Sequence, residues 1–149
     1  MDNLERSGRA ALMRRVKRKN TTPELAVRRM LHARGYRYTL HNSRLPGCPD
    51  IVFSRRRKVV FVHGCFWHGH TCRHGRLPKT NVEFWERKIA QNRARDERVE
   101  RELMAMGWST YTVWQCEIKD ADLLLTVLSA FLGPPSHGRI TRRATIARA

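Results

Sequence analysis

Residues 61–72, FVHGCFWHGHTC, hold the densest group of side chains capable of chemistry in this chain of 149 residues. Within them, Cys65, His70 and Cys72 are close enough in sequence to bind one ion, and Cys116 offers a fourth soft ligand farther along the chain. Three thiolates and one imidazole form the closed tetrahedral ligand set that is typical of structural zinc sites. The spacing therefore predicts a zinc loop at residues 64–80 that is fastened to Cys116.

A second ligand assignment is compatible with this spacing. His68 could take the place of His70, because Cys65-x2-His68 is as acceptable as Cys65-x4-His70, and His74 is a weaker competitor. We favour His70, since it shares a short His-x-Cys turn with Cys72. This choice leaves His68 available for hydrolytic chemistry.

Asp50 and His63 are the residues that the pattern offers for catalysis. Asp50 heads a short apolar strand and His63 ends the next one, in a hairpin whose turn is centred near Arg56. The two residues would then lie approximately opposite each other. A carboxylate can hold Mg2+, and an imidazole beside it can position or deprotonate a water molecule. Ordinary turn chemistry at Pro49-Asp50 is the alternative interpretation.

Phe66 and Trp67 lie inside the expected metal loop. Such a loop cannot turn all of its aromatic side chains into a core, so it would present them rigidly to a binding partner. The alternative is core packing, in particular for Trp85, which could be buried against the sheet.

The charge of the chain favours a polyanionic partner. Thirty lysine and arginine residues stand against thirteen acidic residues, which gives a formal net charge of +17 spread along the whole sequence. Such a surface attracts nucleic acid. The basic segment near the N-terminus is expected to contact the DNA backbone through Arg14, Arg15, Lys17, Arg18 and Lys19.

The N-terminus is polar and basic, and no apolar run approaches the roughly 18 residues that a membrane-spanning helix needs. We therefore expect reduced thiols, a cytoplasmic location and no membrane role.

Periodicity and capping residues predict an α/β domain around a small mixed sheet. Helices are expected at residues 21–35, 82–106 and 121–132, and strands at residues 36–40, 50–53, 59–63 and 109–114. This folded domain, residues 21–132, would follow a basic helix or arm over residues 1–20 and precede a basic, disordered tail over residues 133–149.

These features together resemble the very-short-patch-repair mismatch endonucleases, over about residues 5–132. The resemblance is most specific in the block His63-Gly64-Cys65-Phe66-Trp67-His68. The other matching residues are Met13-Arg14, Thr22-Pro23-Glu24, Leu45-Pro46-Gly47, Pro49-Asp50, His70, Cys72, Phe84-Trp85, Lys88-Ile89, Gly107-Trp108, Trp114 and Cys116.

The resemblance implies a restriction-endonuclease-like fold with a structural zinc. It implies that Asp50 and the main-chain carbonyl of Val62 bind the catalytic Mg2+, that His63 and His68 position water and transfer protons, and that Glu24 assists. It further implies DNA-intercalating side chains, which are Phe66, Trp67, Trp85 and, from the other groove, Met13. The chain departs from the family at Val62, where threonine is frequent, and at Cys48, where a basic residue is common.

The function implied by the resemblance is Mg2+-dependent nicking of one strand 5′ of the thymine in a T:G mismatch, which begins very short patch repair of deaminated 5-methylcytosine. The implied partners are mismatched double-stranded DNA, a cytosine-5 DNA methyltransferase and accessory proteins of mismatch repair. Two rival interpretations stay open: a zinc-containing DNA-binding protein without catalysis, and a restriction-type nuclease of similar fold with another target.

Overall fold

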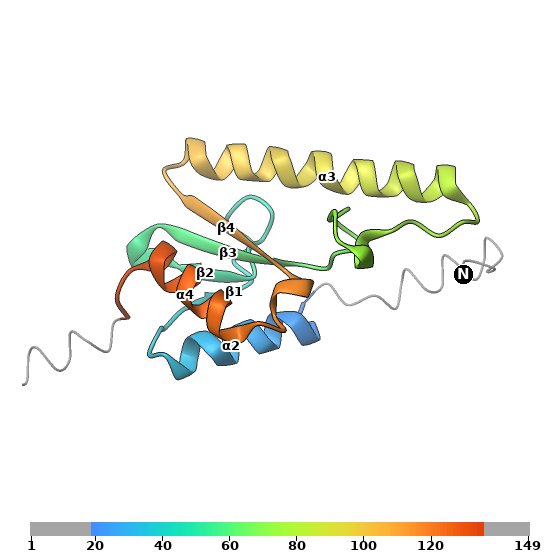
Figure 1. The fold of residues 1–149 in the computed structure, drawn as a ribbon. Helices are drawn as coiled ribbons and strands as arrows, with labels where there is room; N and C mark the ends of the chain where they lie inside the picture. Colours follow the sequence, from blue (N-terminus) through green and yellow to red (C-terminus); the bar gives the residue numbers. More distant parts are fainter. Residues whose placement is uncertain (1–18, 136–149) are drawn as a thin grey trace, which may run out of the picture.

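The computed structural model describes residues 19–135. The described residues therefore do not include Met13, Arg14, Arg15, Lys17 and Arg18, nor most of the expected tail. The helices are α2 (Thr22–Ala33), α3 (Val82–Ala105) and α4 (Ala121–Leu132), and the strands are β1 (Thr39–Leu40), β2 (Ile51–Phe53), β3 (Lys58–His63) and β4 (Ser109–Trp114) (Figure 1).

The four strands form one mixed sheet in the order β1-β2-β3-β4. Strand β2 runs antiparallel to both β1 and β3, whereas β3 and β4 are parallel, with Lys58 opposite Ser109 and His63 opposite Trp114. The connection between these two parallel strands contains the predicted metal loop and α3. The predicted mixed α/β class is confirmed.

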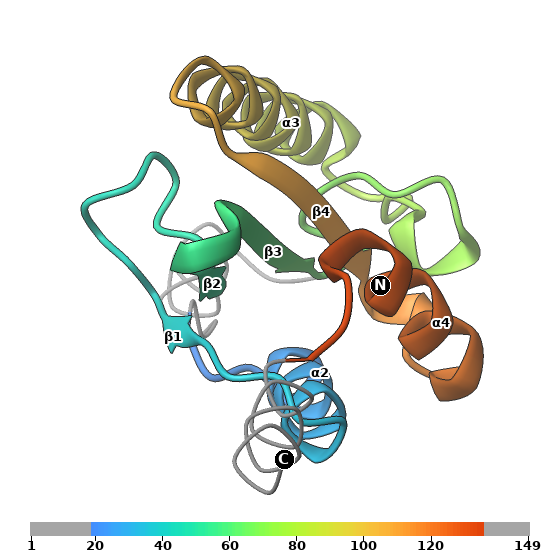
Figure 2. The ribbon, with the colours of Figure 1, turned by 90° about the vertical axis from the view of Figure 1, so that its left-hand side faces the viewer.

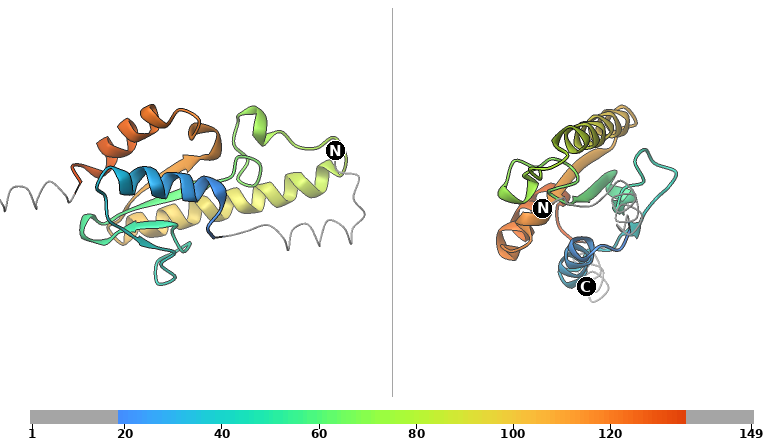
Figure 3. Two further views of the ribbon diagram at one scale, coloured as in Figure 1. Left: turned by 90° about the horizontal axis from the view of Figure 1, so that it is seen from below. Right: turned by 90° about the vertical axis from the view of Figure 1, so that its right-hand side faces the viewer.

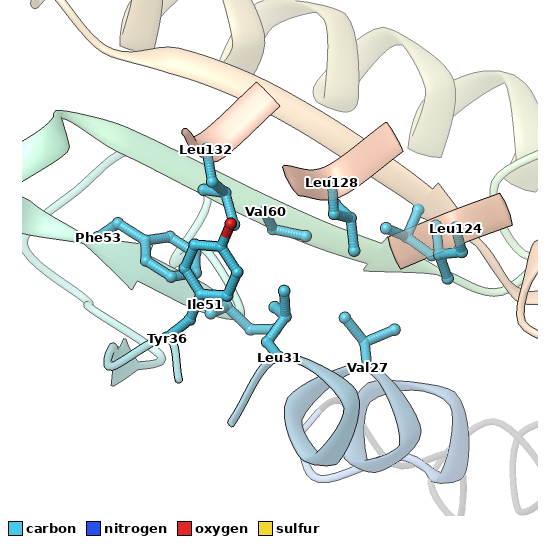
Figure 4. Packing of buried hydrophobic residues seen from close by; sticks show 10 residues of the cluster. Val27, Leu31, Tyr36, Ile51, Phe53, Val60, Leu124, Leu128 and Leu132 are labelled. Atoms are coloured by element: carbon cyan, nitrogen blue, oxygen red, sulfur yellow. The ribbon is translucent and has the colours of Figure 1, made fainter. Parts of the chain in front are cut away.

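Alternation along the strands divides the core into two layers. Ile51, Phe53 and Val60 face α2 and α4, where they pack with Leu31, Leu128 and other apolar residues (Figure 4). Val52 and Val59 face the opposite way and pack against Val99 and Leu103 of α3. The sheet therefore lies between α3 on one side and the α2–α4 pair on the other (Figures 2 and 3).

The start of α2 places an acid in the interior. Thr21 accepts a hydrogen bond from the backbone N–H of Glu24, as the capping pattern predicts. The Glu24 side chain turns back over the first turn and accepts from the N–H of Asn20. Because this helix lies against the sheet, its first turn holds Glu24 almost fully buried, with 1% exposure.

Two expectations about the hairpin region need correction. The first expected strand, residues 36–40, is reduced to Thr39–Leu40, because Tyr36 and Tyr38 pack against Phe53 before pairing begins. The second concerns register: Ile51 pairs with Val60, which places Asp50 opposite Phe61 and not opposite His63. A one-turn 3-10 helix over Ser54–Arg56 and a left-handed Arg57 form the tip and set this register.

The two long helices and the last strand agree with the prediction. The expected helix at residues 82–106 begins at Val82 and ends at Ala105, and its middle is largely exposed. Strand β4 and helix α4 have the predicted bounds. Among residues 19–135, no helix is both long and apolar enough to cross a bilayer.

Candidate active site and metal centre

The carboxyl ends of β3 and β4 bring the soft ligands together. Cys65, His70 and Cys72 follow β3, and Cys116 follows β4 in a 3-10 turn, so that one ligand atom from each lies within 4.8 Å of all the others. Tight turns shape the loop: the N–H of His70 bonds to the carbonyl of Cys65, and a Cβ on Gly75 would come within 1.8 Å of the carbonyl oxygen of His70.

The distance between Cys116 and His70 fits two ligands of a tetrahedral zinc ion. The Sγ atom of Cys116 lies 3.6 Å from Nδ1 of His70. Zinc bonds of about 2.3 Å to sulfur and about 2.05 Å to nitrogen, at a tetrahedral angle, separate the two ligand atoms by about 3.6 Å. The His70 ring also stacks on Trp114, with centroids 4.4 Å apart, so one face of the imidazole packs against the last residue of β4. These four residues could therefore hold a metal.

The thiols of the cluster differ in acidity. The hydrogen bond with His70 lowers the pKa of the Cys72 thiol to about 6. Burial raises the pKa of the Cys65 thiol to about 12 and also raises the pKa of Cys116. Cys72 is therefore the thiol of the cluster that ionises first, and a bound divalent cation would draw the protons from the other two.

His63 and His68 form a second group on the α3 side of the sheet. Their rings are stacked, with centroids 3.8 Å apart and planes 5° from parallel. His68 Nδ1 lies 2.6 Å from Oδ2 of Asp96, and His63 Nδ1 lies 3.9 Å from the same oxygen. Burial, together with the neighbouring His68, lowers the pKa of His63 to about 4, so the ring is neutral at neutral pH. His68 therefore lies in this group, whereas His70 is the histidine that lies among the cysteines.

Asp96 is a residue of this site that the sequence interpretation missed. It lies on α3 three residues before the buried Val99, on the apolar face that also carries Trp85, Ile89 and Leu103. Asn92 occupies the same face and donates to the carbonyl of Trp67 at 2.8 Å. The sequence does carry a signal for these two residues: Asn92 and Asp96 are polar side chains that interrupt the apolar face of the helix at helical spacing.

Glu24, Asp50 and His41 form a third group on the opposite side of β3. Glu24 accepts hydrogen bonds from Arg28 at 3.1 Å and from Nε2 of His41 at 2.9 Å. Asp50 Oδ2 accepts from the backbone N–H of Val62 at 2.8 Å. Burial, and then the Glu24 carboxylate beside it, raises the pKa of Asp50 to about 6, although the Val62 bond opposes this shift.

The side chains of Asp50 and His63 therefore belong to different groups, which corrects the expectation that they form a facing pair. Phe61 and His63 share the face of β3 that looks toward α3, whereas Glu24 comes from α2 on the other face. Asp50 lies at the strand edge, tied to the main chain of Val62. The end of β3 thus separates a carboxylate group from a histidine group.

The aromatic residues singled out in the sequence form one cluster beside the metal loop. Phe66 and Trp67 contact each other at 5.1 Å between ring centroids and lie partly exposed. Trp85 of α3 packs beneath both, at 5.2 Å from Phe66 and 5.8 Å from Trp67, and is only 3% exposed. Trp85 thus supports the other two rings in this conformation.

One of the residues predicted to contact the DNA backbone lies within the part of the chain that the structure describes. Lys19 is exposed at the start of the described residues. Met13, Arg14, Arg15, Lys17 and Arg18 lie outside the described residues. Cys48 has a left-handed backbone, with φ of 47°, and stands outside the cysteine cluster.

Comparison with known proteins identifies related sequences. The family profile described as DNA mismatch endonuclease Vsr matches residues 1–74. The chain is 54% identical to the type II nicking enzyme V.XorIIP of Xanthomonas oryzae pv. oryzae, over 89% of this chain and 98% of that protein. It is 44% identical to the type II nicking enzyme V.NmeAIP of Neisseria meningitidis, over 80% of this chain and 85% of that protein. It is 35% identical to the DNA mismatch endonuclease Vsr of Escherichia coli, over 83% of this chain and 79% of that protein.

The raised pKa of Asp50 predicts that its charge costs stability. Below pH 3.8, the ordinary pKa, the carboxyl is neutral in both the folded and the unfolded chain. Above about pH 6 it is ionised in both, but its charge is buried only in the folded chain. The free energy of unfolding therefore falls as the pH rises from 3.8 to about 6, because the folded chain loses the proton that keeps this buried carboxyl neutral. Asp50→Asn should raise the free energy of unfolding at pH 8, without added divalent cations, by about 1–3 kcal/mol.

Thermal unfolding of both proteins at pH 8 and pH 4 provides the measurement. The gain should largely vanish at pH 4. Asp122→Asn, which removes an exposed carboxylate in the first turn of α4, should give no gain at either pH, because an acid at a helix N-terminus is stabilising. An equal gain at both pH values would show that the charge of Asp50 is not its cause.

Proposed function

The chain belongs to the family of the DNA mismatch endonuclease Vsr and is a DNA endonuclease, and we propose that it nicks one strand 5′ of the thymine in a T:G mismatch. The observation that carries this proposal is the gathering of three groups at one end of the sheet. These are the carboxylates Glu24 and Asp50, the histidines His63 and His68 with Asp96, and the aromatic cluster on the metal loop.

Mg2+ is the proposed catalytic cation, held by the Asp50 carboxylate and the main-chain carbonyl of Val62. The hydrogen bond from the Val62 N–H to Asp50 supports this assignment. In an extended strand the N–H and C=O of one residue point to the same side, so the Val62 carbonyl also faces the edge where Asp50 lies. When bound, Mg2+ would polarise the scissile phosphate and lower the pKa of a water molecule.

The histidine group is proposed to handle the proton. The Asp96 carboxylate beside Nδ1 of His68 favours the tautomer with hydrogen on Nδ1, which leaves Nε2 free to accept a proton from water. His63 stacks on this ring and is neutral, so it can position the water through a hydrogen bond. Glu24, held by three donors, would assist from the other side of β3.

Zinc is the proposed ion of the cluster formed by Cys65, His70, Cys72 and Cys116. Three sulfur ligands favour zinc over Mg2+, and a fully occupied tetrahedron leaves no open position for catalysis. The ion would act structurally, by holding the loop that carries Phe66 and Trp67. It would also fasten that loop to the end of β4 through Cys116.

Phe66 and Trp67 are proposed to enter the duplex beside the mismatch, with Trp85 supporting them from below. Their backbone is ordered by the loop before DNA arrives, so little conformational entropy is lost on binding. Wedging side chains between base steps costs a few kcal/mol, and it costs less at a mismatch because the bases are already poorly stacked. The other residues proposed to approach the DNA are Met13 and the basic Arg14, Arg15, Lys17, Arg18 and Lys19.

The biological setting follows from the target. T:G mismatches arise when 5-methylcytosine deaminates, so a cytosine-5 DNA methyltransferase would act upstream and repair proteins would refill a short patch downstream. The mixed sheet flanked by helices is compatible with the restriction-endonuclease-like fold. The names of several relatives, type II nicking enzymes, are compatible with cleavage of a single strand.

Asp50→Asn should reduce nicking of T:G duplex at least about a thousandfold, because loss of a metal ligand forfeits several kcal/mol of transition-state stabilisation. Binding of the duplex should change little, since no positive charge is lost. Single-turnover cleavage and a binding titration measure the two effects, with Asp122→Asn as the matched control. Undiminished cleavage by Asp50→Asn in Mg2+ would remove Asp50 from the catalytic centre.

Cys72→Ser and Cys116→Ser should each lower both zinc content and melting temperature, because an incomplete ligand set binds the ion weakly. Cys48→Ser is the matched control: it removes a cysteine outside the cluster and should keep about one equivalent of zinc. Metal analysis of the purified proteins and thermal unfolding provide the readouts. One zinc retained in both cluster variants would contradict the ligand assignment.

Trp67→Ala should weaken binding to T:G duplex by roughly ten- to hundredfold, since stacking on one base contributes about 1–3 kcal/mol. Fully paired duplex of the same sequence should lose less affinity, because opening a well-stacked step offsets most of that gain. Trp67→Phe keeps an aromatic face and should restore much of the preference. Equal losses on both duplexes would instead place Trp67 in general DNA contact and favour a restriction-type nuclease with another target.

A further inference from the structure

His41 is a third polar side chain at the carboxylate group, and no sequence pattern had singled it out. It follows β1 directly, and the register of β1 with β2 continues so that the N–H of His41 donates to the carbonyl of Asp50 at 3.2 Å. Its backbone is left-handed, with φ of 48°. Histidine is among the non-glycine residues that adopt this left-handed conformation most readily.

The three side chains are close enough together to bind one octahedral ion. One ligand atom from each of Glu24, His41 and Asp50 lies within 4.8 Å of the other two. Within the group, Nε2 of His41 and Oε2 of Glu24 are 2.9 Å apart. Metal–ligand bonds of about 2.1 Å at right angles separate neighbouring ligand atoms by about 3.0 Å and opposite ones by about 4.2 Å. The three residues thus need little rearrangement to share a cation.

We propose that His41 is a ligand of the cation held by Asp50, with Glu24 completing the set, so that the site favours Mn2+ over Mg2+ more strongly than oxygen ligands alone would. This inference rests on the proposed catalytic cation. An imidazole nitrogen binds first-row transition ions well, whereas Mg2+ prefers oxygen. Burial sharpens the preference, because the His41 and Glu24 side chains are 12% and 1% exposed and water cannot easily replace them.

The opposing arrangement is a purely structural His41, which donates a hydrogen bond to Glu24 and never contacts the ion. His41→Gln separates the two arrangements. The glutamine amide can keep the hydrogen bond to Glu24 and can offer an oxygen to a cation, but it does not coordinate through nitrogen. The variant therefore preserves the carboxylate group and changes only the kind of ligand atom.

Pulsed electron paramagnetic resonance of the Mn2+-loaded protein is the direct test. The protein is purified without chelator, so that the cysteine cluster keeps its metal, and no DNA is added. The wild type should show the coupling of a directly bound imidazole nitrogen to Mn2+. The coupling should disappear in His41→Gln and persist in His63→Gln, which alters the neighbouring histidine group, and in His32→Gln, which alters an exposed histidine at the end of α2.

Calorimetric titration with Mn2+ and with Mg2+ gives a second readout. The ratio of the Mg2+ to the Mn2+ dissociation constant should fall about tenfold in His41→Gln, because a nitrogen ligand is exchanged for oxygen. It should not change in His32→Gln. Absence of nitrogen coupling in the wild type, or its survival in His41→Gln, overturns the proposal and leaves His41 as a hydrogen-bond donor to Glu24.

The nicking assay on mismatched and paired duplexes uses the same preparations. Loss of mismatch preference with the nitrogen coupling intact would refute the proposed function and leave the ligand assignment standing. Mismatch nicking in a wild-type protein that lacks the nitrogen coupling would support the proposed function and refute the assignment of His41 as a ligand.

Discussion

The parallel pairing of β3 with β4 is the constraint on which the rest of the site depends. It places His63 opposite Trp114 at the ends of the two strands, and the chain then enters the metal loop from one strand and the turn of Cys116 from the other. Trp114 stacks on His70 and meets the edge of His63, so it contacts both the cysteine cluster and the histidine group. A shift of this pairing by one residue would turn Trp114 to the other face and separate the groups.

The second determinant is the burial of two carboxylates near each other. Glu24 is stabilised by three donors, but Asp50 has the Val62 N–H and a neighbouring acid, so its ionised form is held at a cost. Two neighbouring buried carboxylates lower the stability of the fold, but they favour the binding of a cation, whose charge would relieve their repulsion. The helix start at Thr21 and the edge of β3 are the local structures that enforce this arrangement.

Much of this organisation could be predicted from the sequence, since periodicity and capping residues located the helices and the strand bearing Trp114. The soft ligands could also be found, because their spacing is informative by itself. Asp96 and His41 were missed for a physical reason: each becomes part of a site only through register, on α3 in one case and across β1 and β2 in the other. The predicted pairing of Asp50 with His63 was wrong for the same reason, because the hairpin tip sets a different register.

The separation of Cys65 from Cys116 in the sequence has a consequence for the order of folding. The hairpin of β2 and β3 and the helix α3 are built from local contacts, whereas the ends of β3 and β4 meet only after a long loop has closed. Closing such a loop is entropically costly and tends to come late. A chain in which β4 has not yet paired with β3 therefore keeps Cys116 apart from Cys65, His70 and Cys72, so these four residues gather only when the topology is complete.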